Sequence, residues 1–202
     1  MERLRRGTVA KQERAARTHE RFLDASADEF ARHGYAGANL QRIASQVGMT
    51  KGALYAHFPS KDALAAVFTS AFDEAWRDLL RKIGDGHPPL ATLRCVTVGF
   101  VHQMHTDLRF RAGLRLAYEE ALARGSAPEV VTGLSAALTR LVGEAQDQKE
   151  LAATHSPELT SSLFLSLIFG SYHSAPSEAS LAHSTQQVRQ VWQLLAVGDT
   201  AA

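Results

Sequence analysis

Residues 40–58 of the chain read LQRIASQVGMTKGALYAHF, and this stretch decides the interpretation of the whole sequence. Its apolar side chains form a single buried set if two short helices meet at a sharp turn. Gly48 permits the backbone of such a turn, and Asn39 and Thr50 are residue types that cap helix N-termini. The other side chains point outward, and most of them can donate hydrogen bonds. The stretch therefore predicts a helix-turn-helix whose second helix is available to the major groove of DNA.

Apolar residues recur at helical spacing along the rest of the chain, and no stretch alternates as a β-strand would. Gly34 is expected to end the first helix with a positive φ. The first helix and the start of the fourth must complete the core of the two short helices, because these cannot bury enough surface alone. The predicted helices cover residues 11–33, 40–46, 51–57, 60–83, 90–106, 108–124, 128–148, 157–173 and 185–196, with a connector rich in Ser, Ala and Pro over 174–184.

The fold class expected from this pattern is all-α, with two domains. Residues 1–61 form an N-terminal arm and a three-helix helix-turn-helix DNA-binding domain. Residues 62–202 form a helical ligand-binding and dimerisation bundle. The charge divides at the same place, because residues 1–61 carry a formal charge of +5 and residues 62–202 carry −4. A basic front half suggests a module that binds a polyanion.

Composition excludes several classes of protein. Apolar residues make up 45% of the chain and charged residues 21%, which is typical of a globular protein rather than a disordered one. Cys95 is the single cysteine, so a disulfide framework and a thiolate metal site are excluded, and we expect its side chain to be a small buried apolar group. The most apolar run, residues 163–169, is too short to span a membrane, and the N-terminus has no apolar signal stretch. We expect a soluble cytoplasmic protein that does not act on membranes.

The sequence does not favour an enzyme. It shows no nucleophile–base pair, no paired-carboxylate site, no phosphate loop and no metal quartet. His102 and His105 share a helix face at a spacing that could ligate a metal, but no spacing supplies the remaining ligands. We therefore expect no metal and no cofactor.

From Arg17 to Leu64 the chain resembles the DNA-binding domain of TetR-family transcriptional regulators. The resemblance is carried by residues 22–26 (FLDAS), Phe30, Gly34, 43–44 (IA), 47–48 (VG), 50–55 (TKGALY) and 57–61 (HFPSK). Within that family, residues 11–18 (KQERAART) and 110–116 (FRAGLRL) resemble the γ-butyrolactone autoregulator receptors. Those receptors carry a ligand-facing tryptophan where this chain has Leu134, so a ligand other than a lactone is an open alternative.

The resemblance implies a DNA-contacting surface on the two short helices. It places Lys51, Gly52 and Tyr55 in the groove, where Lys51 can donate to guanine O6 and N7 and Gly52 lets the backbone approach closely. The other residues of this surface would hold phosphates or touch the flanking strand. The basic arm before the first helix would enter the minor groove or follow phosphates, and an unfolded tail is the alternative. The full predicted surface comprises Asn39, Arg42, Thr50, Lys51, Gly52, Tyr55, His57 and Lys61.

One recognition helix makes too few base contacts to select a site in a genome, which favours a two-fold dimer on an inverted-repeat operator. The last two long helices have the spacing of a helix–helix seam, although the same spacing also suits an intramolecular core. The predicted dimer interface comprises Leu159, Leu163, Phe164, Leu167, Val188, Val191, Trp192 and Leu195.

Aromatic and polar side chains in the middle helices predict an apolar ligand cavity with a few orienting groups, although aromatic residues at this spacing also suit a plain core. The predicted ligand residues are Phe72, Trp76, Thr97, Phe100, His102, His105, Phe110, Tyr118, Leu134, Tyr172 and His173. The sequence thus predicts a repressor that a small apolar ligand, lactone-like or not, releases from a palindromic operator. The alternatives are an orphan DNA-binding regulator without a ligand and, from another class, a small helical enzyme or carrier.

Overall fold

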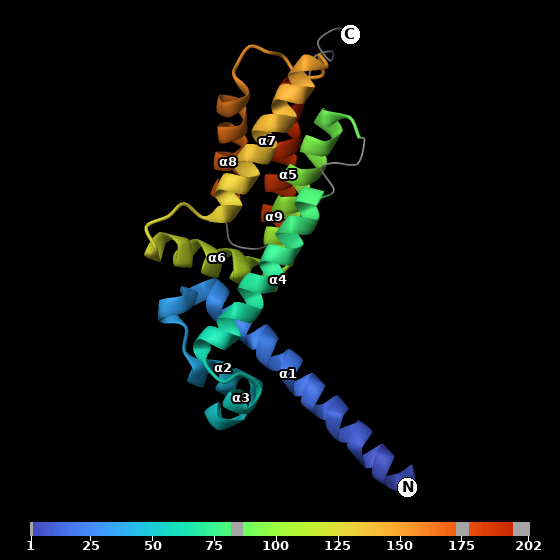
Figure 1. Cartoon of the computed structure of the whole chain (residues 1–202), viewed down its shortest axis with the longest axis vertical. Coiled ribbons are helices and arrows are strands. Elements are labelled where there is room, and N and C mark those ends of the chain that lie inside the picture. Colours follow the sequence, from blue (N-terminus) through green and yellow to red (C-terminus); the bar gives the residue numbers. More distant parts are fainter. Residues whose placement is uncertain (1, 82–86, 173–177, 196–202) are drawn as a thin grey trace. The chain divides into compact units, whose positions relative to one another are not determined.

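The computed structural model describes residues 2–81, 87–172 and 178–195, and within these ranges it leaves the side chains of 2–11, 80, 171–172, 178–180 and 195 undescribed. The described residues form helices and no strand, so the predicted all-α fold is confirmed (Figure 1). None of these helices is long and apolar enough to cross a membrane. The elements are α1 (Glu2–Gly37), α2 (Leu40–Val47), α3 (Lys51–His57), α4 (Lys61–Arg81), α5 (Pro89–Thr106), α6 (Leu108–Ala123), α7 (Glu129–Asp147), α8 (Pro157–Tyr172) and α9 (Glu178–Leu195).

Two predicted helix starts are wrong. α1 begins at Glu2 rather than at residue 11, so the backbone of the expected arm continues the helix. α9 begins at Glu178, inside the stretch expected to be a connector. That connector is rich in Ser, Ala and Pro, but it also contains good helix formers, among them Glu178, Ala179 and Leu181. The expected helix end at Gly34 is confirmed, because Gly34 has a φ of 66° and interrupts the helical geometry of α1.

The chain divides into two compact units, which do not meet at the predicted boundary after residue 61. The N-terminal unit comprises Met1–Phe72 together with Leu108–Glu119, and the C-terminal unit comprises Asp73–Asp107 together with Glu120–Ala202. The first turns of α4 and most of α6 therefore belong with the helix-turn-helix.

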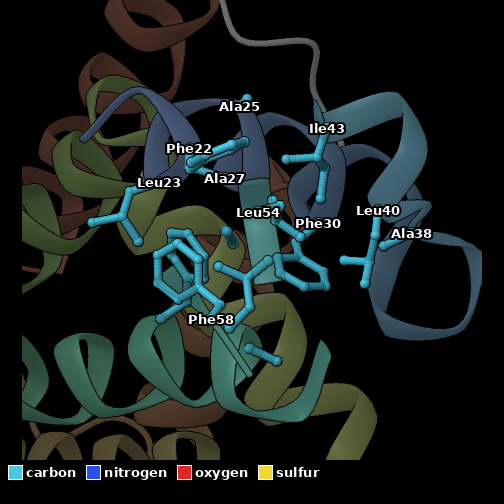
Figure 2. Packing of buried hydrophobic residues seen from close by; sticks show 14 of the residues in the cluster. Phe22, Leu23, Ala25, Ala27, Phe30, Ala38, Leu40, Ile43, Leu54 and Phe58 are labelled. Carbon is cyan, nitrogen blue, oxygen red and sulfur yellow. The ribbon is translucent and has the colours of Figure 1, made fainter. Parts of the chain in front are cut away.

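The core of the N-terminal unit is built where α1 crosses the two short helices. Figure 2 shows Phe22 and Phe30 of α1 gathered with Ile43 and Leu54, and each of these side chains is at most 1% exposed. The start of α4 and the middle of α6 contribute further buried members of the same cluster, which are Leu64, Ala65, Phe68, Ala112 and Leu116. The predicted three-helix core is thus completed by a segment of α6 that lies far away in sequence.

Polar side chains of α6 also complete the end of α1 inside this unit. Beyond the break at Gly34, the Tyr35 backbone N–H donates to Glu119 Oε2 at 2.7 Å. The Arg115 Nη1 donates to the Ala31 carbonyl oxygen at 2.9 Å, and Arg115 and Glu119 pair with each other. These contacts satisfy backbone groups that a helix end leaves without intrahelical partners.

In the C-terminal unit, α5 is the central helix and contacts α7, α8 and α9. Trp192 of α9 is fully buried, its ring stacks on Phe164 of α8 at 3.5 Å between centroids, and its Nε1 donates to Thr97 Oγ1 of α5 at 2.8 Å. Val188 is 1% exposed in the same core. Phe164, Val188 and Trp192 were predicted at the dimer interface, and the structure assigns them instead to the core of a single chain. Helical spacing identifies a buried seam but does not say which helix fills it.

Candidate nucleic-acid interface

The turn between α2 and α3 has the cap residues that the sequence predicts. The Asn39 side chain accepts a hydrogen bond from the Gln41 N–H at 2.8 Å, and Thr50 Oγ1 accepts one from the Ala53 N–H at 3.2 Å. Gly48 lies in the left-handed region with a φ of 74°, and its N–H donates to carbonyl oxygens of the last turn of α2. These caps satisfy backbone groups at both helix ends, so the turn is well defined.

The outer face of α3 presents Lys51, Gly52 and Tyr55, all of which are exposed, while Leu54 anchors the helix in the core. Lys51 Nζ lies 5.7 Å from the centroid of the Tyr55 ring. A Cβ atom added to Gly52 would meet only Thr50 Oγ1, at 3.8 Å, so no contact within the chain requires glycine there. Glycine is unfavourable in a helix, and a glycine without an internal reason suggests that another surface comes close.

His57 is less available than the sequence predicts. Its ring is half-buried at the end of α3, with centroid distances of 5.5 Å to Phe22 and 5.7 Å to His19. His19 itself stacks on Phe58 at 4.7 Å. His57 therefore contributes to packing between α1 and α3, and only the exposed part of its ring remains for a phosphate.

Arg42 was predicted to touch the flanking DNA strand, but its guanidinium is bound within the chain. Nε and Nη2 donate to Glu29 Oε1 at 3.0 and 2.5 Å, and Nη2 also donates to the Gly37 carbonyl oxygen at 2.9 Å. Glu29 Oε1 accepts the Asn39 backbone N–H at 2.7 Å as well. Arg42 and Glu29 thus join α2 to the end of α1. The sequence pattern missed Glu29, because nothing in it distinguishes a buried carboxylate from a solvated one.

Lys61, like Arg42, has partners within the chain. It was predicted to hold a phosphate, but its Nζ donates to the Ala38 carbonyl oxygen at 2.7 Å and lies 4.8 Å from the centroid of the Tyr35 ring. Its side chain is half-buried. Lys61 therefore fixes the start of α4 to the loop before α2.

The positive charge that stays available on this unit lies on α1 and α3. Arg14, Arg17 and Lys51 are exposed, and none of the three has an ion-pair partner within the part of the chain that the structure describes. Arg21 belongs to the fold instead, because its Nη2 donates to the Val47 carbonyl oxygen at 2.8 Å. Available cations beside an exposed helix are the feature that phosphate contacts require.

Acid is expected to destabilise the N-terminal unit through Glu29. Burial alone would raise the pKa of Glu29, but the hydrogen bonds from Arg42 and from the Asn39 N–H, together with the charge of Arg42, hold this pKa below its ordinary value of 4.5. A carboxyl whose pKa is lowered by folding stabilises the fold above the ordinary pKa, and this contribution is lost as the pH falls through the lowered one. Urea unfolding followed by circular dichroism from pH 7 to pH 3 measures the loss.

Glu29→Gln is the control for this prediction. It should lower the free energy of unfolding at pH 7 by about 1 kcal/mol, because a charged partner of Arg42 is removed, and it should flatten the acid dependence. An acid dependence equal to that of the parent would assign the titration to another carboxyl.

The predicted ligand residues fall in both compact units. In the N-terminal unit, the buried rings of Phe72 and Phe110 pack at 4.9 Å, while Tyr118 is exposed. In the C-terminal unit, Trp76, Thr97, Phe100 and Leu134 are buried, His105 is half-buried and His102 is exposed. The Tyr172 side chain and His173 lie outside the described residues. Among the described residues, no three His, Cys, Asp or Glu side chains gather where a metal ion could be held.

A groove of about 620 Å³ lies between α5 and α9 in the C-terminal unit, and His102 is the predicted ligand residue that lines it. Cys95 lines the same groove and is exposed, which corrects the expectation that it is a buried apolar group. Of the predicted interface residues outside the core, Leu159 and Leu163 are 51% and 57% exposed, and Leu167 and Val191 are half-buried. The side chain of Leu195 is not described.

Comparison with known proteins finds similarity to bacterial regulators. The tetR family of bacterial regulatory proteins matches residues 22–67. The A-factor receptor protein of Streptomyces griseus is 27% identical over 91% of this chain, which spans 64% of the length of that relative. RutR, an HTH-type transcriptional regulator of Escherichia coli K12, is 31% identical over 43% of this chain and 42% of its own length.

Solved structures share the fold over most of the chain. CprB from Streptomyces coelicolor, in complex with its biological operator sequence, has a TM-score of 0.71 at 26% identity, covering 93% of this chain and 92% of CprB. A γ-butyrolactone receptor described as ArpA-like has a TM-score of 0.67 at 26% identity, covering 90% of this chain and 87% of the receptor. The relatives named here are receptors and transcriptional regulators rather than enzymes.

Proposed function

We propose that the chain, whose residues 22–67 match the tetR family of bacterial regulatory proteins, is a DNA-binding transcriptional regulator. In this proposal two copies bind an inverted-repeat operator in the cytoplasm and repress transcription, and a small apolar ligand relieves the repression by releasing them. The observation that carries the proposal is the exposed face of α3, where Gly52 has no internal reason to be glycine and Lys51 has no ion-pair partner within the described residues.

The groove-facing roles proposed for α3 follow from its side chains. Lys51 donates to guanine O6 and N7, the Gly52 backbone approaches the base edges, and Tyr55 contacts a thymine methyl group or a phosphate. Thr50 at the helix N-terminus and the exposed part of His57 bind phosphates, and Asn39 contacts the flanking DNA strand. Arg42 and Lys61 bond within the N-terminal unit, to Glu29 and to the Ala38 carbonyl oxygen.

Dimer formation rests on the exposed leucines of α8. Leu159 and Leu163 lie one turn apart on one helix face and are more than half exposed, which is costly for a pair of leucines that stays in water. A second copy of α8 would cover them, with Leu167 and Val191 at the edge. We keep the functional division proposed from the sequence, in which residues 1–61 contact DNA and residues 62–202 bind ligand and partner.

The ligand is the least constrained part of the proposal. The relatives described as γ-butyrolactone receptors favour a small-molecule effector, and Leu134, which stands where those receptors carry a tryptophan, is fully buried. An orphan regulator without a ligand is the second candidate, and it retains every residue of the DNA surface.

Lys51→Ala is the experiment that tests DNA recognition. Operators are first selected from random duplexes with the purified chain, and they are expected to contain two symmetric half-sites about 34 Å apart between centres. The variant should bind its best site about tenfold more weakly and lose its preference at one base position in each half-site. Binding is measured by fluorescence anisotropy at several salt concentrations.

Two matched variants separate base contact from stability and charge. Lys61→Ala should lower the free energy of unfolding while the base preference stays unchanged, because the amine bonds to Ala38. Arg140→Ala removes one positive charge from α7, where Arg140 pairs with Glu144, and should bind as the parent does. If Lys51→Ala keeps the base preference of the parent, Lys51 makes no base contact.

A further inference from the structure

The groove between α5 and α9 has the properties of an anion-binding site. The two helices lie side by side in the C-terminal unit (Figure 1) and form an open groove of about 620 Å³. Pockets that hold small organic ligands occupy about 300–1,000 Å³. Arg94 and His102 line the groove from α5, Arg189 lines it from α9, and none of the lining residues is acidic.

The two guanidinium groups are not neutralised within the described part of the chain. Neither the Arg94 nor the Arg189 guanidinium has an ion pair or a hydrogen bond there, although Arg77, Arg124 and Arg140 of the same unit each pair with a carboxylate one helical turn away. The sequence explains this difference. The residues four positions from Arg94 are Leu90 and Val98, and those four positions from Arg189 are Thr185 and Gln193, so no acid is within reach on either helix.

The rest of the lining is largely apolar, with Thr185 and Gln193 as uncharged polar members. Val98 and Gly99 are half-exposed, Cys95 adds a thiol, and the arginine stems add methylene groups. A ligand that fits must therefore combine an apolar body with an anionic group. A carboxylate, sulfonate or phosphate monoester can accept paired hydrogen bonds from a guanidinium fork, which gives Arg an advantage over a point charge.

We propose that the α5–α9 groove binds a small organic anion, with its charged group between Arg94 and Arg189 and its apolar body against Val98. His102 donates a further hydrogen bond to the anion. In the regulator proposed above, this anion is an effector, and that part of the inference rests on the proposed function. Binding in the groove does not depend on DNA.

Two dyes with the same aromatic body test the charge requirement. Anilinonaphthalenesulfonate carries an anionic sulfonate, and N-phenylnaphthylamine is its uncharged counterpart. The full-length protein is titrated with each dye, and fluorescence enhancement gives the affinity. The sulfonate should bind at least tenfold more tightly than the neutral dye, and decanoate should displace it. Equal affinities for the two dyes would overturn the proposal.

Variants locate the binding site. Arg94→Gln and Arg189→Gln should each weaken sulfonate binding about tenfold and leave the neutral dye unaffected, and the double variant should lose saturable sulfonate binding. Arg140→Gln, which removes an exposed arginine of α7, is the matched control and should bind as the parent does. Unchanged sulfonate affinity in the double variant would overturn the assignment.

Cys95 supplies a readout in the unmodified protein. It is the single cysteine of the chain, it is exposed, and it lines the groove. Saturating sulfonate dye should slow its reaction with iodoacetamide at least fivefold, and an unchanged rate would place the dye elsewhere. This measurement remains valid if an arginine variant fails to fold.

The proposed function is tested separately. The arginine variants should bind the selected operator as the parent does, because their changes lie outside the N-terminal unit. A protein that binds the dye but no duplex would contradict the regulator and leave the groove assignment standing. A protein that binds duplex but not the dye would overturn the groove assignment and leave the regulator standing.

Discussion

Trp192→Ala is expected to lower the free energy of unfolding of the C-terminal unit by about 3–5 kcal/mol, the usual range for a buried tryptophan. Trp192 is fully buried, its ring stacks on Phe164 at an interplanar angle of 10°, and its Nε1 bonds to Thr97. Truncation therefore opens a cavity among α5, α8 and α9 and removes a buried hydrogen bond. Urea unfolding followed by the fluorescence of Trp76, which belongs to the same unit, measures the loss.

A double-mutant cycle separates the hydrogen bond from the ring. Thr97 Oγ1 accepts from Trp192 and also donates to the Leu93 carbonyl oxygen at 2.7 Å, so both functions of this hydroxyl are used. Thr97→Val should cost about 1–3 kcal/mol, because it leaves the indole N–H buried without a partner. In the Trp192→Phe background the same change should cost less, since that N–H is gone. Equal costs in the two backgrounds would mean that the bond contributes nothing.

The burial of Trp192 also changes how a dimer is to be tested. Because the sequence places Trp192 at the dimer interface, a charged residue there would be expected to separate two subunits. Since Trp192 is buried in the core of one chain, the same change is instead expected to unfold the C-terminal unit. Loss of DNA binding in that variant would therefore say nothing about an interface. The surface leucines of α8 are the positions at which an interface can be probed without disturbing the core.

Gly52→Gln is expected to weaken operator binding about a hundredfold without lowering the stability of the protein. Gly52 lies on the exposed face of α3, and a Cβ there would have open space on the protein side. In the proposed complex that space is occupied by the groove of the duplex. Both recognition helices of a dimer carry the change, so a cost of about 1.4 kcal/mol at each half-site doubles to about 2.8 kcal/mol, which is a factor of about 100.

Stability and binding should move in opposite directions at this residue. Replacing an exposed helical glycine raises the free energy of unfolding by up to about 0.5 kcal/mol, because glycine loses more backbone entropy on folding. Gly143→Ala in α7 is the matched control, since an added Cβ meets only Pro157 Cγ at 3.8 Å. It should give a similar gain in stability with unchanged affinity. If the Gly52→Gln protein binds the operator as the parent does, α3 does not enter the groove of the duplex.

Sequence periodicity was sufficient to predict the all-helical fold and the turn between α2 and α3, although it placed the starts of α1 and α9 wrongly. The caps at Asn39 and Thr50 and the positive φ at Gly48 depend on residues within one turn of each other, so they are visible locally. The inclusion of α6 residues in the N-terminal unit could not be predicted in this way. Ala112 and Leu116 join the cluster that contains Phe22 only through tertiary packing.

Charged side chains were the weakest part of the sequence interpretation. A basic residue near a helix-turn-helix is assigned to phosphate by its position, but Arg42 and Lys61 each have a partner inside the fold, a buried carboxylate in one case and a backbone carbonyl in the other. Conversely, no motif or spacing in the sequence distinguishes Arg94 and Arg189 from other surface arginines. Their significance depends on what surrounds them, and a linear pattern does not contain that information.

The N-terminal unit cannot be exchanged between homologues as one continuous cassette. Its core takes Ala112 and Leu116 from a segment that follows more than thirty residues of the other unit. A chimaera joined at a single crossover after residue 61 or 72 would combine one parent's helix-turn-helix with the other parent's α6, so packing at Phe68 and Gly113 would be mismatched. A chimaera that transfers operator specificity must therefore take both the helix-turn-helix and the counterpart of residues 108–119 from the same parent. The alternative is to change recognition by point substitutions on α3 alone.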